Sequence, residues 1–249
     1  MDPQIAQRLL DHAFLSQGQR VLDLATGTGL VAIDAAQRVG RTGSVIGVDI
    51  ATDMIECARQ KAAALGLTNV DFLVADAEDL NFPAGSFDHL FCSSALIWMS
   101  DLPKALRLWH RVLKPGGLLG FHAFAETAFI AGVVAQRVLE RQGISVLLNK
   151  PTGTVEKCHR LLTQAGFVDI DFKVEVDGSY LSLERLRGMW LGDSSSPAPG
   201  QYPNPVSLLS AEQLAAARAD YVQELETLQT DQGIWSDSTI FYTYGRKAL

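Results

Sequence analysis

The stretch VLDLATGTGLVAIDAA, residues 21–36, decides the fold because it joins a buried strand to a helix through a glycine-rich turn. Its first residues are apolar apart from Asp23, and the residues from 30 onward have helical spacing. Gly27 and Gly29 stand in the turn, where small residues let backbone N–H groups approach a ligand closely. The stretch therefore predicts a cleft for an adenosine-containing cofactor at the end of the strand.

The same alternation of strand and helix continues through the first half of the chain. Further strands are predicted at residues 44–50, 70–76, 87–94 and 118–124. The helices are predicted at residues 3–15, 30–39, 52–65 and 101–113. Apolar strands separated by helices are typical of a parallel sheet that is covered on both faces. The sequence therefore predicts a doubly wound α/β fold.

The second half of the chain interrupts this pattern twice. We interpret the chain as a single domain, 1–249, because no internal repeat is present. Its core covers about residues 15–124, 150–177 and 236–249, and ends in a polar/apolar alternation typical of a last strand. The two insertions, about 125–149 and 178–235, are mainly helical and rich in apolar and aromatic residues. They are predicted to form a cap over a substrate.

Composition limits the classes of partner. The formal net charge is −7 and no cluster of Lys and Arg stands out, which disfavours nucleic acids and anionic membranes. Neither a membrane-spanning run nor the pattern of a signal peptide is found, so we expect a soluble, cytoplasmic protein. The three cysteines lie far apart, and no metal site or disulfide is predicted from them.

Acidic residues near the turn narrow the choice of cofactor. Asp49 follows Gly29 by 20 residues at the end of the second strand, where a carboxylate can hold a ribose diol. Asp23 would repel a pyrophosphate, but it would suit an amine or a sulfonium. Asp76 ends the third strand and can accept a hydrogen bond from an adenine amino group. No Lys follows the glycines, which excludes a P-loop, whereas a nicotinamide-dependent dehydrogenase stays an alternative.

Taken together, the ordered motifs VLDLATGTG, GVDI and FLVADAEDLNFPAGSFDHLFCSSALIWMSDLPKALRLWHRVLKPGGLL resemble those of a known family. They are similar to the class I S-adenosylmethionine-dependent methyltransferases, and within them to the small-molecule enzymes related to the ubiquinone/menaquinone C-methyltransferases. The resemblance covers about residues 18–125, with weaker support from the last strand. It implies a mostly parallel, seven-stranded Rossmann-like sheet whose last strand is antiparallel, with S-adenosyl-L-methionine as the cofactor.

The resemblance also assigns cofactor-binding roles to individual positions. Asp23 would lie near the ammonium group, the turn would pass close to the methionine moiety, Asp49 would bind the ribose hydroxyls, and Asp76 would read the adenine edge. The full set of expected cofactor-binding residues is Asp23, Ala25, Gly27, Gly29, Asp49, Ile50, Met54, Asp76, Ala77, Cys92 and Ser93. Two positions depart from the family pattern: Ala25 replaces a frequent glycine, and Ala51 replaces a serine, so that Thr52 is a candidate cap of the following helix.

The acceptor side of the site is less defined. His122 ends the fifth strand and is a candidate general base, with a structural histidine as the alternative interpretation. Trp98, Phe124, Tyr180 and Trp190 are candidates for an aromatic acceptor pocket, as are Phe129, Tyr202 and Trp235. Cys92 is not expected to act as a nucleophile because no basic partner accompanies it.

The resulting hypothesis is a small-molecule methyltransferase that acts on a largely hydrophobic acceptor as a monomer or homodimer. Methyl transfer from a sulfonium needs alignment and exclusion of water more than acid–base groups. O-methylation is slightly favoured over N- or C-methylation. The alternative from another class is a module that binds S-adenosylmethionine without catalysis.

Overall fold

The computed structural model describes residues 3–191 and 205–249. Its contacts divide the chain into two compact units. Unit 1 comprises the chain up to residue 122 together with residues 158–173 and 242–249, and unit 2 comprises residues 123–157 and 174–241. The segments predicted as insertions therefore fold with each other. Their role as a cap stays a prediction.

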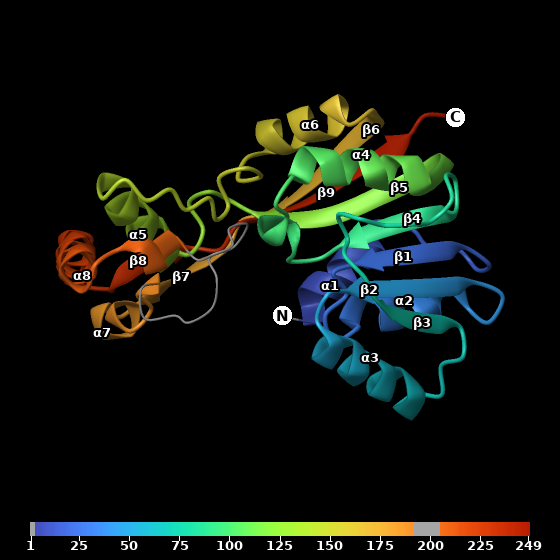
Figure 1. The fold of residues 1–249 in the computed structure, drawn as a ribbon, viewed down its shortest axis with the longest axis horizontal. Helices are drawn as coiled ribbons and strands as arrows, with labels where there is room; N and C mark the ends of the chain where they lie inside the picture. Colours follow the sequence, from blue (N-terminus) through green and yellow to red (C-terminus); the bar gives the residue numbers. More distant parts are fainter. Residues whose placement is uncertain (1–2, 192–204) are drawn as a thin grey trace. The chain divides into compact units, whose positions relative to one another are not determined.

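A seven-stranded sheet organises the fold (Figure 1), with the strand order β3-β2-β1-β4-β5-β9-β6. β1 pairs in parallel with both β2 and β4, and the last strand is antiparallel, as predicted. Helices flank the sheet, so the predicted doubly wound Rossmann-like fold is confirmed. The strands are β1 (Arg20–Leu24), β2 (Ser44–Asp49), β3 (Val70–Val74), β4 (Phe87–Cys92), β5 (Leu113–Phe124), β6 (Phe167–Glu175) and β9 (Ile240–Lys247).

Local sequence signals set the ends of α2 and the start of α4, whereas the first helix ends at Asp11 instead of residue 15, and Thr52 is the first residue of α3 rather than its cap. α2 buries an apolar face that includes Val31, Ala35 and Val39, and it ends at Gly40, whose φ is +65°. The side chain of Asp101 caps α4 by accepting a hydrogen bond from the Lys104 N–H. The helices are α1 (Pro3–Asp11), which precedes β1, and α2 (Leu30–Val39), α3 (Thr52–Ala64), α4 (Leu102–Val112) and α6 (Val155–Gln164), with the 3₁₀ helix η1 (Leu96–Trp98) before α4.

The start of β5 differs from the prediction, which began this strand at residue 118. Phe87 pairs with Leu113 and His89 pairs with Leu118, so residues 114–117 form an irregularity opposite a single residue of β4. Gly116 lies there with a φ of +74°. The helix already ends at Val112, before the run KPGG, and the chain joins the sheet at Leu113.

Unit 2 contains α5 (Ile130–Arg141), β7 (Gly178–Leu181), α7 (Leu183–Arg187), the 3₁₀ helix η3 (Pro205–Leu208), α8 (Ala211–Thr227) and β8 (Ile234–Asp237). β7 and β8 form a separate antiparallel pair that the sequence analysis did not predict. Ser210 and Gln213 form a capping box at the start of α8. Over the ranges 3–191 and 205–249, no helix is long and apolar enough to cross a membrane.

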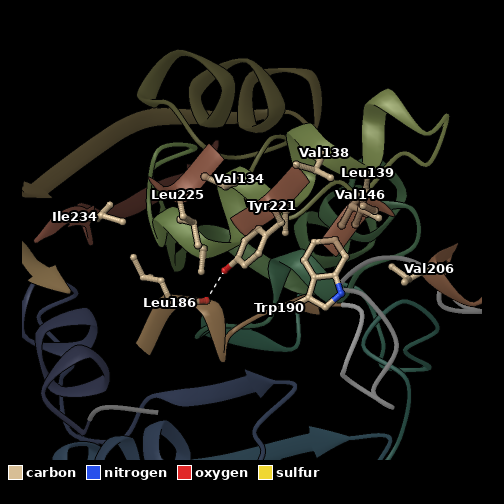
Figure 2. Close-up of a cluster of buried hydrophobic side chains, with 13 residues drawn as sticks. Val134, Val138, Leu139, Val146, Leu186, Trp190, Val206, Tyr221, Leu225 and Ile234 are labelled. Atoms are coloured by element: carbon tan, nitrogen blue, oxygen red, sulfur yellow. Dashed lines mark hydrogen bonds between the residues drawn. The ribbon is translucent and has the colours of Figure 1, made fainter. Parts of the chain in front are cut away.

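One hydrophobic cluster holds unit 2 together (Figure 2). In it the rings of Trp190 and Tyr221 lie 4.9 Å apart, and the Tyr221 hydroxyl donates a hydrogen bond of 2.6 Å to the carbonyl of Leu186. This bond joins α8 to α7. The buried members are Ala131, Val134, Ala135, Val138, Leu139, Val146, Leu186, Trp190, Val206, Ala217, Tyr221, Leu225 and Ile234.

We expect Tyr221→Phe to lower the free energy of unfolding by about 1 kcal/mol, because it removes a buried hydrogen bond to the Leu186 carbonyl, which keeps the Met189 N–H as its other donor. Tyr180→Phe is the matched control, since Tyr180 is half-exposed. Denaturant unfolding of the three proteins checks this. Equal stability of the Tyr221 and Tyr180 variants would contradict the role given to the hydrogen bond.

Candidate functional site

The glycine turn follows β1 and leads into α2. Ala25, Gly27 and Gly29 all have positive φ, at +50°, +54° and +82°. Ala25 therefore adopts a left-handed conformation at the position where the resembling family often has glycine. A Cβ on Gly27 would meet no atom within 4 Å, whereas one on Gly29 would lie 3.1 Å from the Phe72 ring. A side chain at Gly27 would fill open space beside the turn. A side chain at Gly29 would crowd the packed ring of Phe72.

Asp23 lies in the interior of unit 1 rather than at an open surface. One of its oxygens accepts hydrogen bonds from the Thr26 hydroxyl at 2.5 Å and from the Ala32 N–H at 3.1 Å. Burial raises the pKa of Asp23 to about 7, although both hydrogen bonds act to lower it, and the nearby charge of Asp49 raises it further. In this structure Asp23 holds the turn against the start of α2. Its predicted approach to a ligand ammonium stays a prediction.

Asp49 ends β2 with a partly buried carboxylate next to the turn. One oxygen accepts a hydrogen bond from the Gly27 N–H at 2.8 Å, and the other accepts one from the Ala51 N–H at 2.9 Å. A carboxylate has about four acceptor positions, so each oxygen keeps capacity for a ligand hydroxyl. Beyond it, Ile50 and Met54 are 72% and 44% exposed, which leaves apolar surface beside the carboxylate.

The segment after β3 contains Asp76 and Ala77. Asp76 is exposed, and its carboxylate accepts the Glu78 N–H at 2.8 Å. Ala77 is buried, and its carbonyl accepts a hydrogen bond from the Trp109 indole. Glu78, which the sequence analysis did not single out, accepts hydrogen bonds from both Ser100 and Asp101. Partial burial acts to raise the pKa of Glu78, but these hydrogen bonds lower it overall.

The ends of β4 and β5 bring together a histidine and two serines. His122 is 1% exposed, with Nδ1 3.2 Å from the Ser93 hydroxyl and Nε2 2.9 Å from the Ser94 hydroxyl. Burial lowers the pKa of His122 to about 4, so the ring is neutral at physiological pH. This favours the alternative of a structural histidine over a general base, whose pKa would lie near the working pH.

Cys92 stands before these serines as the last residue of β4, paired with Leu24 on one side and Phe121 on the other. It is fully buried, and burial raises the pKa of its thiol. A neutral, enclosed thiol fits a packing residue at the base of the site. Ser93 is also buried.

The candidate aromatic residues of the acceptor pocket fall into different surroundings. Trp98 is half-exposed in unit 1, and Tyr180 is half-exposed in unit 2, where its ring lies 5.2 Å from that of Trp235. Phe124 packs against Phe129 at 4.7 Å. Trp190 is buried in the hydrophobic cluster of unit 2, so it is a core residue there. Tyr202 lies outside the described residues.

Three residues at this edge of unit 1 had no assigned role in the sequence analysis. Thr26 and Glu78 are polar neighbours of predicted site residues, and their position beside Gly27 and Asp76 was the available signal. Ser94 has a φ of +58°, which could not be predicted because the position holds neither glycine nor asparagine, the residues that most often adopt a positive φ. Its contact with His122 depends on the pairing of β4 with β5 and has no local signature.

Comparison with known proteins agrees with this arrangement. A family model described as "Methyltransferase domain" matches residues 21–117. These residues are therefore similar to a methyltransferase domain. The resemblance to class I S-adenosylmethionine-dependent methyltransferases related to the ubiquinone/menaquinone enzymes is confirmed.

Two curated relatives each match about half of this chain. The aklanonic acid methyltransferase DauC of Streptomyces sp. (strain C5) is 41% identical over 128 residues, which are 51% of this chain and 57% of that protein. The ubiquinone/menaquinone biosynthesis C-methyltransferase UbiE of Edwardsiella ictaluri (strain 93-146) is 42% identical over 123 residues, 49% of each chain. The chain therefore spans about half the length of the curated relatives it matches.

A solved structure shares the fold over almost the whole chain. It is a phosphoethanolamine N-methyltransferase 2 of Haemonchus contortus in complex with S-adenosyl-L-methionine, with a TM-score of 0.59 and 21% identity. The similarity covers 98% of this chain and 52% of that one. At this identity it shows that the fold is shared.

The raised pKa of Asp23 predicts a pH-dependent stability. A carboxyl group that binds its proton more tightly when folded contributes stability below about pH 4, and this contribution is lost as the pH rises through about 7. The amide of Asp23→Asn is neutral at every pH. We therefore expect the free energy of unfolding of this variant, relative to that of the natural protein, to rise by about 2–3 kcal/mol between about pH 5 and about pH 8. Denaturant unfolding at both pH values measures the difference.

Asp71→Asn is the control for this experiment, because it removes an exposed carboxylate from β3. Its stability relative to the natural protein should hardly change with pH. The assignment of a buried, neutral Asp23 would be wrong if Asp23→Asn behaved in the same way.

Proposed function

We propose that this chain is an S-adenosylmethionine-dependent methyltransferase that acts on a small, largely hydrophobic molecule. The observation that carries the proposal is the Asp49 carboxylate at the end of β2, hydrogen-bonded to the N–H of Gly27 within a matched methyltransferase domain. The names of the relatives, which include an aklanonic acid methyltransferase and a ubiquinone/menaquinone C-methyltransferase, support a small-molecule acceptor.

The residues at this edge of unit 1 fit the cofactor. The open space beside Gly27 leaves room for close approach to the backbone, and both Asp49 oxygens keep acceptor capacity for the ribose diol. The exposed side chains of Ile50 and Met54 provide apolar surface for the adenine. We propose that Asp76 and the backbone of Ala77 bind the adenine edge, and that Cys92 and Ser93 form the base of the site.

When bound, S-adenosylmethionine supplies a methyl group on a positively charged sulfur, so the leaving group is already activated. The protein then has to align the acceptor atom with the methyl group and exclude water. A site made of backbone N–H groups, a carboxylate and a neutral histidine suits that task. We propose a hydroxyl oxygen as the acceptor atom, with nitrogen and carbon as the alternatives.

Calorimetric titration with S-adenosylmethionine, S-adenosylhomocysteine and NAD tests the proposal directly. We expect dissociation constants in the micromolar range for the two sulfur ligands and no binding of NAD. Binding of NAD alone would replace the proposal by a dehydrogenase. A protein that binds the sulfur ligands but transfers no methyl group to any acceptor would be a binding module.

Asp49→Ala tests the ribose assignment. We expect it to weaken binding of S-adenosylhomocysteine by about 1.5–3 kcal/mol, the range for a hydrogen bond to a charged group. Asp49→Asn keeps one carbonyl acceptor and should lose less. Asp53→Ala removes an exposed carboxylate of α3, four residues further along the chain, and should leave the affinity unchanged. Unchanged affinity in Asp49→Ala would remove the assignment.

A further inference from the structure

Ser94 occupies an unusual position at the edge of unit 1 where the proposed cofactor site lies. It follows β4 by two residues, and its φ of +58° is a conformation that a residue with a Cβ rarely adopts. Such a conformation brings Cβ close to the backbone and is unfavourable in an L-residue. The contacts of the side chain give a reason for keeping a serine there.

The hydroxyl of Ser94 is held by His122. The Ser94 Oγ lies 2.9 Å from Nε2 of His122, and the Ser93 Oγ lies 3.2 Å from Nδ1 on the other side of the ring. The imidazole is therefore fixed between two hydroxyl groups. Of these three side chains, Ser93 and His122 are buried, whereas Ser94 is partly exposed.

The hydrogen-bonding capacity that Ser94 keeps follows from the chemistry of the pair. A neutral imidazole has one N–H and one unprotonated nitrogen, and a hydroxyl has one donor and two acceptor positions. If Ser94 donates to Nε2, both lone pairs of its oxygen are left. If Nε2–H donates to Ser94, one lone pair and the O–H are left. In both tautomers the Ser94 oxygen can therefore accept one further hydrogen bond.

We propose that Ser94 is an acceptor-binding residue, whose oxygen accepts a hydrogen bond from the hydroxyl group that is to be methylated. His122 is a positioning residue in this arrangement, because it fixes the rotation of the Ser94 hydroxyl without contacting the acceptor. The inference rests on the proposed methyltransferase function and assigns a hydroxyl-bearing substrate class to it. A methyl ether, which has no O–H to donate, is then bound less well than the corresponding alcohol.

The experiment uses the full chain saturated with S-adenosylhomocysteine and two probes of the same shape, 2-naphthol and 2-methoxynaphthalene. We expect the natural protein to bind 2-naphthol about five- to tenfold more tightly than the methyl ether, the range for one neutral hydrogen bond. Ser94→Ala and Ser94→Gly should both reduce this preference to less than about twofold. Ser94→Gly is included because glycine adopts the positive φ without strain.

Ser86→Ala is the matched control, since it removes a hydroxyl group that precedes β4 and bonds only locally to the Pro83 carbonyl. The preference for 2-naphthol should persist in it. Nitrogen-15 NMR of labelled histidine gives a second measurement, because addition of 2-naphthol should shift the Nε2 resonance of His122 in the natural protein but not in Ser94→Gly.

The two proposals fail in different ways. If the natural protein does not bind S-adenosylhomocysteine, the proposed function is contradicted, and this is known before either naphthalene probe is added. Binding of S-adenosylhomocysteine without a preference for 2-naphthol, or with no binding of 2-naphthol, would overturn the role of Ser94 alone. A preference that survives in both Ser94 variants would overturn it as well.

Discussion

The buried carboxyl group of Asp23 is the contact on which the site in unit 1 depends. It joins the end of β1 to Thr26 in the turn and to the Ala32 N–H in the first turn of α2. That N–H is one of the groups at a helix start that have no partner within the helix. With the turn fixed in this way, the N–H of Gly27 reaches the Asp49 carboxylate at the end of β2. Two neighbouring strands are thus coupled through a few polar atoms.

The two acids have different surroundings and therefore different tasks. Asp23 has lost its contact with water, and the charge of Asp49 adds to the effect of burial in raising its pKa. Asp49 is only partly buried, and its two oxygens accept hydrogen bonds from the N–H groups of Gly27 and Ala51. Asp23 fixes the backbone of the turn, and Asp49 lies partly exposed where a ligand can reach it.

Much of the fold follows from local signals in the sequence. The periodicity of residues 30–39 and the glycine that follows give the observed bounds of α2, and the ends of α3 and α4 differ from the prediction by one residue. The early start of β5 could not be predicted because it depends on pairing with β4 across an irregularity. β7 and β8 have four residues each and lie far apart in the chain, so periodicity identifies neither.

The site was predictable where it depends on residue type and position, and not where it depends on the direction of a side chain. Asp49 and the glycines stand where the motif places them. The hydrogen bonds of the Asp23 side chain to Thr26 and to the Ala32 N–H could not be predicted from the motif, and its expected approach to a ligand ammonium stays a prediction. Trp190 shows the same limit. An aromatic residue in an insertion suits a pocket or a core equally well, and its packing against Tyr221 makes it core.

Unit 2 has a consequence for how the two insertions can be treated in experiments. Its hydrophobic cluster draws Val134 and Leu139 from the first chain segment, and Leu186, Tyr221 and Ile234 from the second. Deleting the second segment alone would therefore expose the apolar face of α5, which would cost tens of cal/mol for each Å² left in water. A loss of activity after such a deletion would then reflect unfolding of α5 as much as loss of an acceptor cap. The two segments share one hydrophobic cluster, so each depends on the other for its folding.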